Sequence, residues 1–126
     1  FKILLYKHKI FINMLLKIND NKFKVMVMMT QKDTQKGMMG RDFDSNFNGM
    51  LFLMDKGPHG FWMKDCIIPL DIIFIDGNTI TKIHHSCPPC KSEDCPSYVG
   101  TGDTILELRG GTCSELGIES GDIIRY

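Results

Sequence analysis

Residues 70–83 read LDIIFIDGNTITKI, and this stretch decides the fold that the sequence predicts. Residues 70–75 are apolar apart from Asp71, which is typical of a strand buried on both faces. A turn at residues 76–78 separates this strand from a second strand-like run over residues 79–83. An Asp-Gly pair between two such runs is a strong signal for a β-hairpin. The hairpin is therefore the starting point from which the rest of the fold is predicted.

Shorter patterns of the same kind lie on both sides of this hairpin, and turn-forming residues separate them. We expect further strands over residues 22–29, 49–54, 60–64, 104–109 and 122–125, a turn at residues 55–58 and a loop over residues 84–103. Thr30 offers an N-cap for a short helix over residues 31–39, and Thr112 caps a single helical turn ending at Gly117. These elements predict an α+β, mostly β fold, in which an antiparallel, partly closed, barrel-like sheet carries two short helices.

The chain has 126 residues, which is the length of one domain. We expect residues 20–126 to form a single globular domain. Residues 1–19 are an N-terminal extension or a first strand. For residues 1–13, upstream translation, a truncated leader and a real strand all fit the sequence.

The net charge is zero, but positive charge gathers near the N-terminus. Residues 1–41 contain nine lysine or arginine residues against two aspartates. These cations are scattered among apolar residues and form no basic stripe with aromatic side chains, so we expect no nucleic-acid partner. No apolar run approaches the roughly 20 residues of a transmembrane helix. We therefore expect a monomeric protein without a transmembrane segment.

Two acidic residues, Asp71 and Glu107, stand inside otherwise apolar strands. A buried carboxylate needs an ion pair or hydrogen bonds, because an uncompensated buried charge costs several kcal/mol. One interpretation is structural: Arg41 and Lys64 satisfy these carboxylates and nearby loop carbonyls. Another is a pocket for a small polar ligand, lined by Arg41, Trp62, Lys64, Asp71 and Glu107. A third is a hydrolase using Asp71 and Glu107, which requires the two carboxyl groups within about 10 Å across an open cleft.

The cysteines form a second candidate site in the predicted loop. Cys87 and Cys90 are separated by two prolines, and Cys95 follows. Three alternatives fit this pattern. The cysteines could form a tetrahedral Zn²⁺ site, to which Cys113 could add a fourth sulfur; two of them could form a disulfide that closes the loop; or all three could be free thiols. A thioredoxin-like role is disfavoured, because no helix N-terminus follows to lower the pKa of the first thiol. No residue is assigned to catalysis by this pattern.

Four segments in this order resemble domain-of-unknown-function family 192, over roughly residues 20–126. They are GMMGR at residues 37–41, GMLF at 49–52, FWMKD at 61–65 leading to PLDIIFID at 69–76, and LEL at 106–108 with the glycines that follow. The chain departs from the pattern at Asp65-Cys66, where Asn-Thr is common, and at Met38, where Leu is usual. The resemblance implies a compact, barrel-like β fold with no established activity.

Many members of that family look exported or membrane-tethered, so export is an alternative to the cytoplasmic location that this chain suggests. The sequence has no Gly-x-Ser-x-Gly elbow, no His-Glu-x-x-His helix and no phosphate-binding glycine loop. We therefore expect a non-enzymatic domain that binds a small ligand or acts as an accessory module. A metal-binding or redox role of the cysteine loop is the alternative, with Zn²⁺ as its cofactor.

Overall fold

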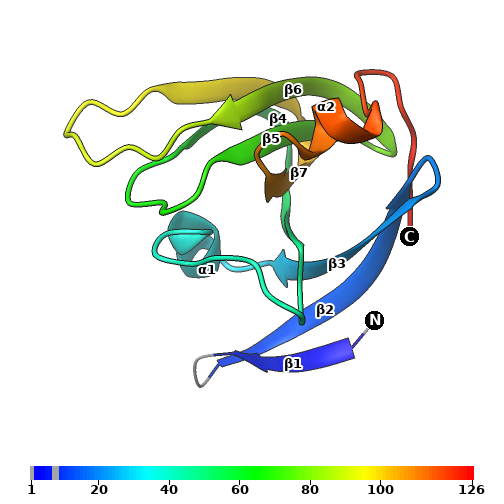
Figure 1. Ribbon diagram of the computed structural model, residues 1–126, viewed down its shortest axis with the longest axis horizontal. Coiled ribbons are helices and arrows are strands. Elements are labelled where there is room, and N and C mark those ends of the chain that lie inside the picture. Colours follow the sequence, from blue (N-terminus) through cyan, green and yellow to red (C-terminus); the bar gives the residue numbers. More distant parts are fainter. Residues whose placement is uncertain (1, 7–8) are drawn as a thin grey trace.

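The computed structural model describes residues 2–6 and 9–126 of the chain, and these residues form one curved, mostly antiparallel β-sheet with two short helices (Figure 1). The strands are β1 (Lys2–Tyr6), β2 (Lys9–Ile18), β3 (Asn21–Met28), β4 (Gly49–Trp62), β5 (Leu70–Asp76), β6 (Thr79–Cys87), β7 (Ser97–Arg109) and β8 (Ile124–Arg125). The helices are α1 (Gln31–Lys36) and α2 (Thr112–Leu116). The predicted mostly β fold with two short helices is confirmed.

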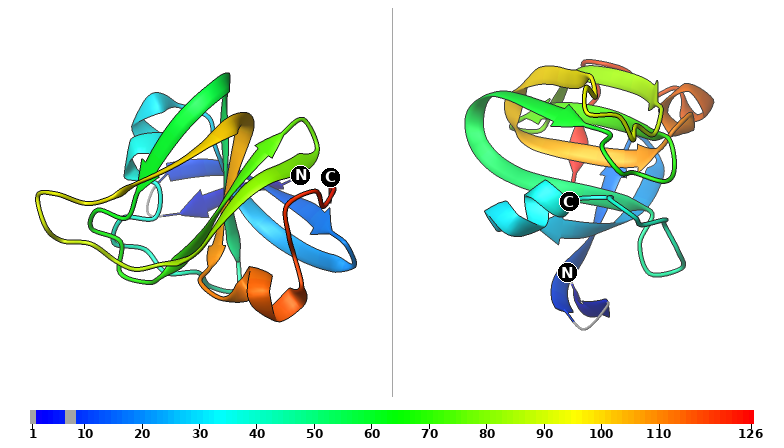
Figure 2. Two further views of the ribbon diagram at one scale, coloured as in Figure 1. Left: turned by 90° about the horizontal axis from the view of Figure 1, so that it is seen from above. Right: turned by 90° about the vertical axis from the view of Figure 1, so that its left-hand side faces the viewer.

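The order of strands in the sheet is β1-β2-β3-β4-β7-β5-β6, with β8 paired to β2. All the pairs are antiparallel except β3 with β4, which run parallel because α1 and a loop connect them. The C-terminal segment connects β6, at one end of this order, to β2, which is next to β1 at the other end. It bonds to β2 through Ile124 and Arg125, and to β6 through the backbone of Ile80 and Asp122. The sheet is thereby partly closed into a half-barrel (Figure 2).

Two predicted connections are wrong because strands run through them. The expected turn at residues 55–58 belongs to β4, which continues past a register shift between Leu53 and Gly57. The expected loop at residues 84–103 is shorter, since β6 extends to Cys87 and β7 already begins at Ser97. In both cases a neighbouring strand supplies hydrogen-bond partners, and this tertiary pairing overrides the local preference for a turn.

The predicted helix at residues 31–39 is also too long. Its N-cap is confirmed, since the Thr30 hydroxyl accepts a hydrogen bond from the Asp33 N–H at 3.1 Å. The helix ends at Lys36 because Gly37 takes a positive φ of 46° and its N–H bonds back to the Asp33 carbonyl. Near the N-terminus, where the sequence allowed either an extension or a first strand, residues 9–18 form strand β2, which pairs with both β3 and β8.

Each face of the sheet carries its own apolar core. The aliphatic core, next to α2, consists of Leu16, Ile18, Phe23, Val25, Val27, Leu51, Ile73, Ile75, Ile80, Leu106, Leu108, Cys113, Ile118 and Ile124. The methionine-aromatic core, next to the end of α1, consists of Phe11, Met26, Met28, Met38, Phe47, Met50, Phe52, Met63, Cys66, Leu70, Ile72, Phe74, Cys87 and Ile105. The two helices lie on opposite sides of the half-barrel (Figures 1 and 2).

Candidate functional site

Asp71 is completely buried on the aliphatic side of the sheet, where backbone groups surround its carboxylate. Oδ1 accepts hydrogen bonds from the N–H groups of Ser86 at 2.8 Å and Gly111 at 3.1 Å, and Oδ2 accepts one from Cys113 at 2.9 Å. The N-cap of α2, Gly111, provides no side-chain cap, so this carboxylate takes that role from a distant strand. Asp71 therefore ties the end of β6 and the start of α2 to β5.

Glu107 lies on the opposite face of the sheet from Asp71. In the pairing of β5 with β7, Ile72 faces Glu107 and Asp71 faces Leu108, and directly paired residues share one side. Glu107 therefore belongs to the methionine-aromatic side, and the two carboxylates share no cleft. The arrangement that a hydrolase using Asp71 and Glu107 requires is absent.

Glu107 is buried but lacks the partners that Asp71 has. Its exposed fraction is 3%, and it makes no hydrogen bond or ion pair with any residue that the structure describes. Burial alone raises the pKa of its carboxyl group to about 8. At neutral pH the group is therefore mostly a neutral acid, which can donate one hydrogen bond as well as accept others.

A half-open groove of about 650 Å³ reaches Glu107 from the surface. Its apolar walls are Met38 and Met39 after α1, Phe52, Met54, Phe61 and Trp62 on β4, and Cys66. The rings of Phe52 and Phe61 meet edge to face, with centroids 4.9 Å apart. Trp62 is 49% exposed, which is unusual for so large a side chain and places part of its ring at the open side of the groove. The size and lining are those of a small-molecule site.

Positive charge borders the same groove. Lys32 and Lys36 both line it, and their spacing of four residues places them on one face of α1. Both side chains are exposed, and neither has a hydrogen bond or ion pair within the described part of the chain. The groove thus has a buried acid, aromatic walls and a basic rim.

Cys66 is the only cysteine that lines this groove among the residues described. Burial first, and then the negative charges of Glu107 and Asp65, raise the pKa of its thiol to about 12. A thiol that stays protonated at physiological pH is a poor nucleophile. Cys66 is therefore a packing residue of this groove.

The five predicted binding residues are distributed over four places. Trp62 and Glu107 both line the groove, while Asp71 lies on the opposite face of the sheet. The guanidinium of Arg41 is buried over the Phe11 ring, 5.5 Å from its centroid, and the Lys64 Nζ donates to the Ser92 carbonyl at 2.8 Å. The structure therefore brings together only two of the five, and neither Arg41 nor Lys64 lines the groove.

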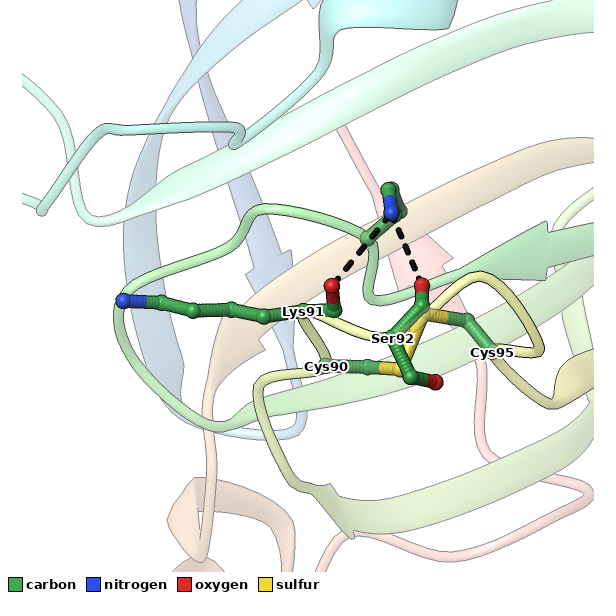
Figure 3. Close-up of a disulfide and its surroundings, with 5 residues drawn as sticks. Cys90, Lys91, Ser92 and Cys95 are labelled. Carbon is green, nitrogen blue, oxygen red and sulfur yellow. Dashed lines mark hydrogen bonds between the residues drawn. A yellow bond between two sulfur atoms is a disulfide. The ribbon is translucent and has the colours of Figure 1, made fainter.

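The cysteine loop contains a disulfide between Cys90 and Cys95, and Lys64 bonds to the carbonyls of Lys91 and Ser92 between them (Figure 3). Cys87 is free and buried in the methionine-aromatic core, whereas Cys113 is buried in the other core. The four sulfurs therefore do not share one site. Within the described residues no group of three or more His, Cys, Asp or Glu side chains could hold a metal ion.

Sequence reasoning missed most of the groove. Phe52, Phe61 and Met38 read as ordinary core residues, and nothing local shows that β4 and the end of α1 leave space between them. The spacing of Lys32 and Lys36 was the one available signal, since it marks a basic face on the predicted helix.

Comparisons with known proteins agree with this fold. The crystal structure of "a putative transcription regulator" from Sinorhizobium meliloti 1021 is 27% identical, with a TM-score of 0.81, and the match covers 91% of this chain and 94% of that one. A protein of unknown function from Novosphingobium aromaticivorans DSM 12444 is 25% identical, with a TM-score of 0.80 and coverage of 99% and 93%. A comparison with curated proteins finds no match.

No helix in the described part of the chain is long and apolar enough to cross a membrane. The family model of DUF192, described as "Uncharacterized ACR", matches residues 14–126, which is nearly the whole chain and includes every residue of the groove. The chain belongs to the DUF192 family.

Proposed function

We propose that this chain is a non-enzymatic domain that binds a small, partly apolar ligand in the groove between α1 and β4, with Glu107 as its polar contact. The observation that carries the proposal is a buried acid that has no partner among the described residues and lies where a ligand can reach it. A ligand that hydrogen-bonds to Glu107 supplies this partner, and such a hydrogen bond contributes about 1 kcal/mol.

The composition of the groove supports binding over catalysis. Among the described residues, the titratable groups that line it are Lys32, Lys36, Cys66 and Glu107, so these offer neither a histidine nor a second carboxylate to share proton transfer. The thiol is protonated, as its raised pKa indicates. Flexible thioethers and aromatic rings make up the rest, and such side chains adapt to the shape of a bound molecule.

The proposal also includes the oligomeric state and the compartment of the protein. The groove is complete within one chain, so we propose that a monomer binds the ligand. Disulfides persist in oxidising compartments, and the Cys90–Cys95 bond therefore favours export over the cytoplasm.

The test uses 2-phenylethanol, which carries an aromatic ring and one uncharged hydroxyl group. Trp62 is the single tryptophan of the chain, so its fluorescence reports on the groove alone. We expect the probe to change this fluorescence and to shift the backbone NMR signals of groove residues. Glu107→Leu should weaken binding about tenfold, because it removes a hydrogen bond worth about 1.4 kcal/mol.

Glu115→Leu is the matched control, since Glu115 is an exposed residue of α2 on the other side of the half-barrel. It should leave the affinity unchanged. Signals that shift only outside the groove, or equal affinity in the Glu107→Leu variant, would refute the proposal.

A further inference from the structure

We infer that the ligand of this groove is zwitterionic, with an ammonium group that contacts Glu107 and an anionic group that contacts Lys32 and Lys36. The inference rests on the function proposed above and specifies the chemical class of its ligand. Three features carry it: Glu107 has no counter-charge among the residues that the structure describes, aromatic rings form one wall, and the two lysines have no partner in the same described part of the chain.

The deep end of the groove suits a cation. Glu107 is 3% exposed and has no ion pair with a described residue. Its carboxylate gains most from an ammonium group at hydrogen-bond distance, because charges attract strongly where water is excluded. The rings of Phe52, Phe61 and Trp62 line the same space. Their electron-rich faces attract an ammonium group further through cation–π contacts.

The open end of the groove suits an anion. Lys32 and Lys36 project from one face of α1 and have no acidic partner within residues 2–6 and 9–126, whereas the Nζ of Lys64 donates to loop carbonyls. Two exposed ammonium groups attract a carboxylate or phosphate, and they repel a ligand that carries only positive charge. A molecule with both charges complements both ends, so it should bind better than a simple amine.

Proton binding links these charges to pH. In the empty groove the pKa of Glu107 is about 8, so pairing with an ammonium group releases the proton that the acid carries at neutral pH. Among the described residues, the other titratable groups facing this space are the Cys66 thiol, the lysines of α1 and, through the core, the Cys87 thiol, whose pKa burial raises to about 11. Neither thiol ionises below pH 8. The affinity for an amine should therefore increase about tenfold between pH 6 and pH 7.

The experiment compares four probes that share a phenyl ring and differ in charge: L-phenylalanine, 2-phenylethylamine, 3-phenylpropionate and 2-phenylethanol. Affinities come from Trp62 fluorescence and NMR titration at pH 6 and pH 7. We expect L-phenylalanine to bind most tightly, followed by the amine, with the anion weakest. Only the two amines should gain affinity as the pH rises.

Variants assign each charge to its site. Glu107→Gln keeps the shape and hydrogen bonds of the acid, so it should reduce amine affinity at least tenfold, abolish its pH dependence and leave 2-phenylethanol binding nearly unchanged. The double variant Lys32→Gln, Lys36→Gln should weaken L-phenylalanine several-fold and should not weaken the amine. Lys82→Gln, at an exposed position of β6 outside the groove, is the control for lost positive charge and should change neither.

The possible outcomes distinguish failure of this inference from failure of the proposed function on which it rests. Suppose that 2-phenylethanol binds in the groove and that the anion or the alcohol binds as tightly as L-phenylalanine. The inference of a zwitterionic ligand is then wrong, while the proposed binding of a small ligand is retained. Equal amine affinity at pH 6 and pH 7 would also overturn the inference. If no probe of the four shifts the groove signals, both proposals fail.

Discussion

Asp71 and Glu107 occupy neighbouring places on adjacent strands, and both are buried, yet the protein treats them in opposite ways. Three backbone N–H groups satisfy the Asp71 carboxylate, whereas Glu107 has no partner among the described residues. A buried charge in a strand is therefore not by itself a sign of function. The presence or absence of protein partners separates a structural acid from one that is available to a ligand.

The two cores that contain these acids also differ in the side chains that they are made of. Asp71 belongs to the aliphatic core, which contains no fully buried methionine, while five buried methionines share the core of Glu107 (Met26, Met28, Met38, Met50 and Met63). Branched aliphatic side chains hold few conformations, and methionine holds many. The rigid side fixes a helix to the sheet, and the adaptable side contains the groove.

The largest expected effect comes from breaking the structural acid. In the natural chain three N–H donors face the Asp71 carboxylate. Asp71→Asn replaces this carboxylate with an amide and removes the charge that strengthens all three hydrogen bonds. We expect a loss of about 4 kcal/mol in the free energy of unfolding, measured by urea denaturation. Asp76→Asn, at the half-exposed end of the same strand beside Lys56, is the matched control and should cost less than about 0.5 kcal/mol. Similar losses for both variants would contradict the structural role of Asp71.

The second prediction concerns Glu107 and the sign of its pH dependence. Its pKa rises from an ordinary 4.5 to about 8 on folding, so between these values the folded chain keeps a proton that the unfolded chain loses. Stability should therefore decrease as the pH rises, by up to about 1.4 kcal/mol per pH unit, and level off above pH 8.

Glu107→Gln resembles the protonated acid and cannot ionise, so it removes this slope. Urea denaturation at pH 5, 6 and 7 should show the variant gaining stability relative to the natural chain at each step. Taking the difference between the two proteins cancels the pH dependence that they share. Curves that stay parallel would mean that Glu107 ionises normally in the folded chain.

The smallest expected effect compares two thiols, one on each side of the sheet. Burial raises the pKa of both Cys66 and Cys113 to about 12, but Cys66 lines the groove and is 4% exposed, while Cys113 is completely buried beside Asp71. Methyl methanethiosulfonate at pH 8 should modify Cys66 several-fold faster, because Cys113 reacts only after local unfolding. Peptide mass spectrometry measures both rates. In concentrated urea the difference should vanish, and equal rates in the folded protein would show that the groove gives no access to Cys66.

Much of the fold could be predicted from local patterns. The hairpin at residues 70–83, the Thr30 N-cap and the burial of Asp71 and Glu107 follow from alternation, turn chemistry and capping, which depend on near neighbours. The extra length of β4 and β7 could not be predicted in this way. Their outer halves contain glycine, proline and polar residues, and they form strands because they pair with each other from Gly57↔Gly102 to Trp62↔Ser97.

The local sequence is enough to predict that two carboxylates are buried in apolar strands, because side chains alternate along an extended backbone and their neighbours are hydrophobic. The groups that each carboxylate contacts depend on how distant segments pack together. Strand register sends Asp71 and Glu107 to opposite faces, and the partners of Asp71 come from backbone up to 42 residues away in the chain. Contacts between such distant segments depend on how the whole sheet closes, and no local pattern of residues records that closure.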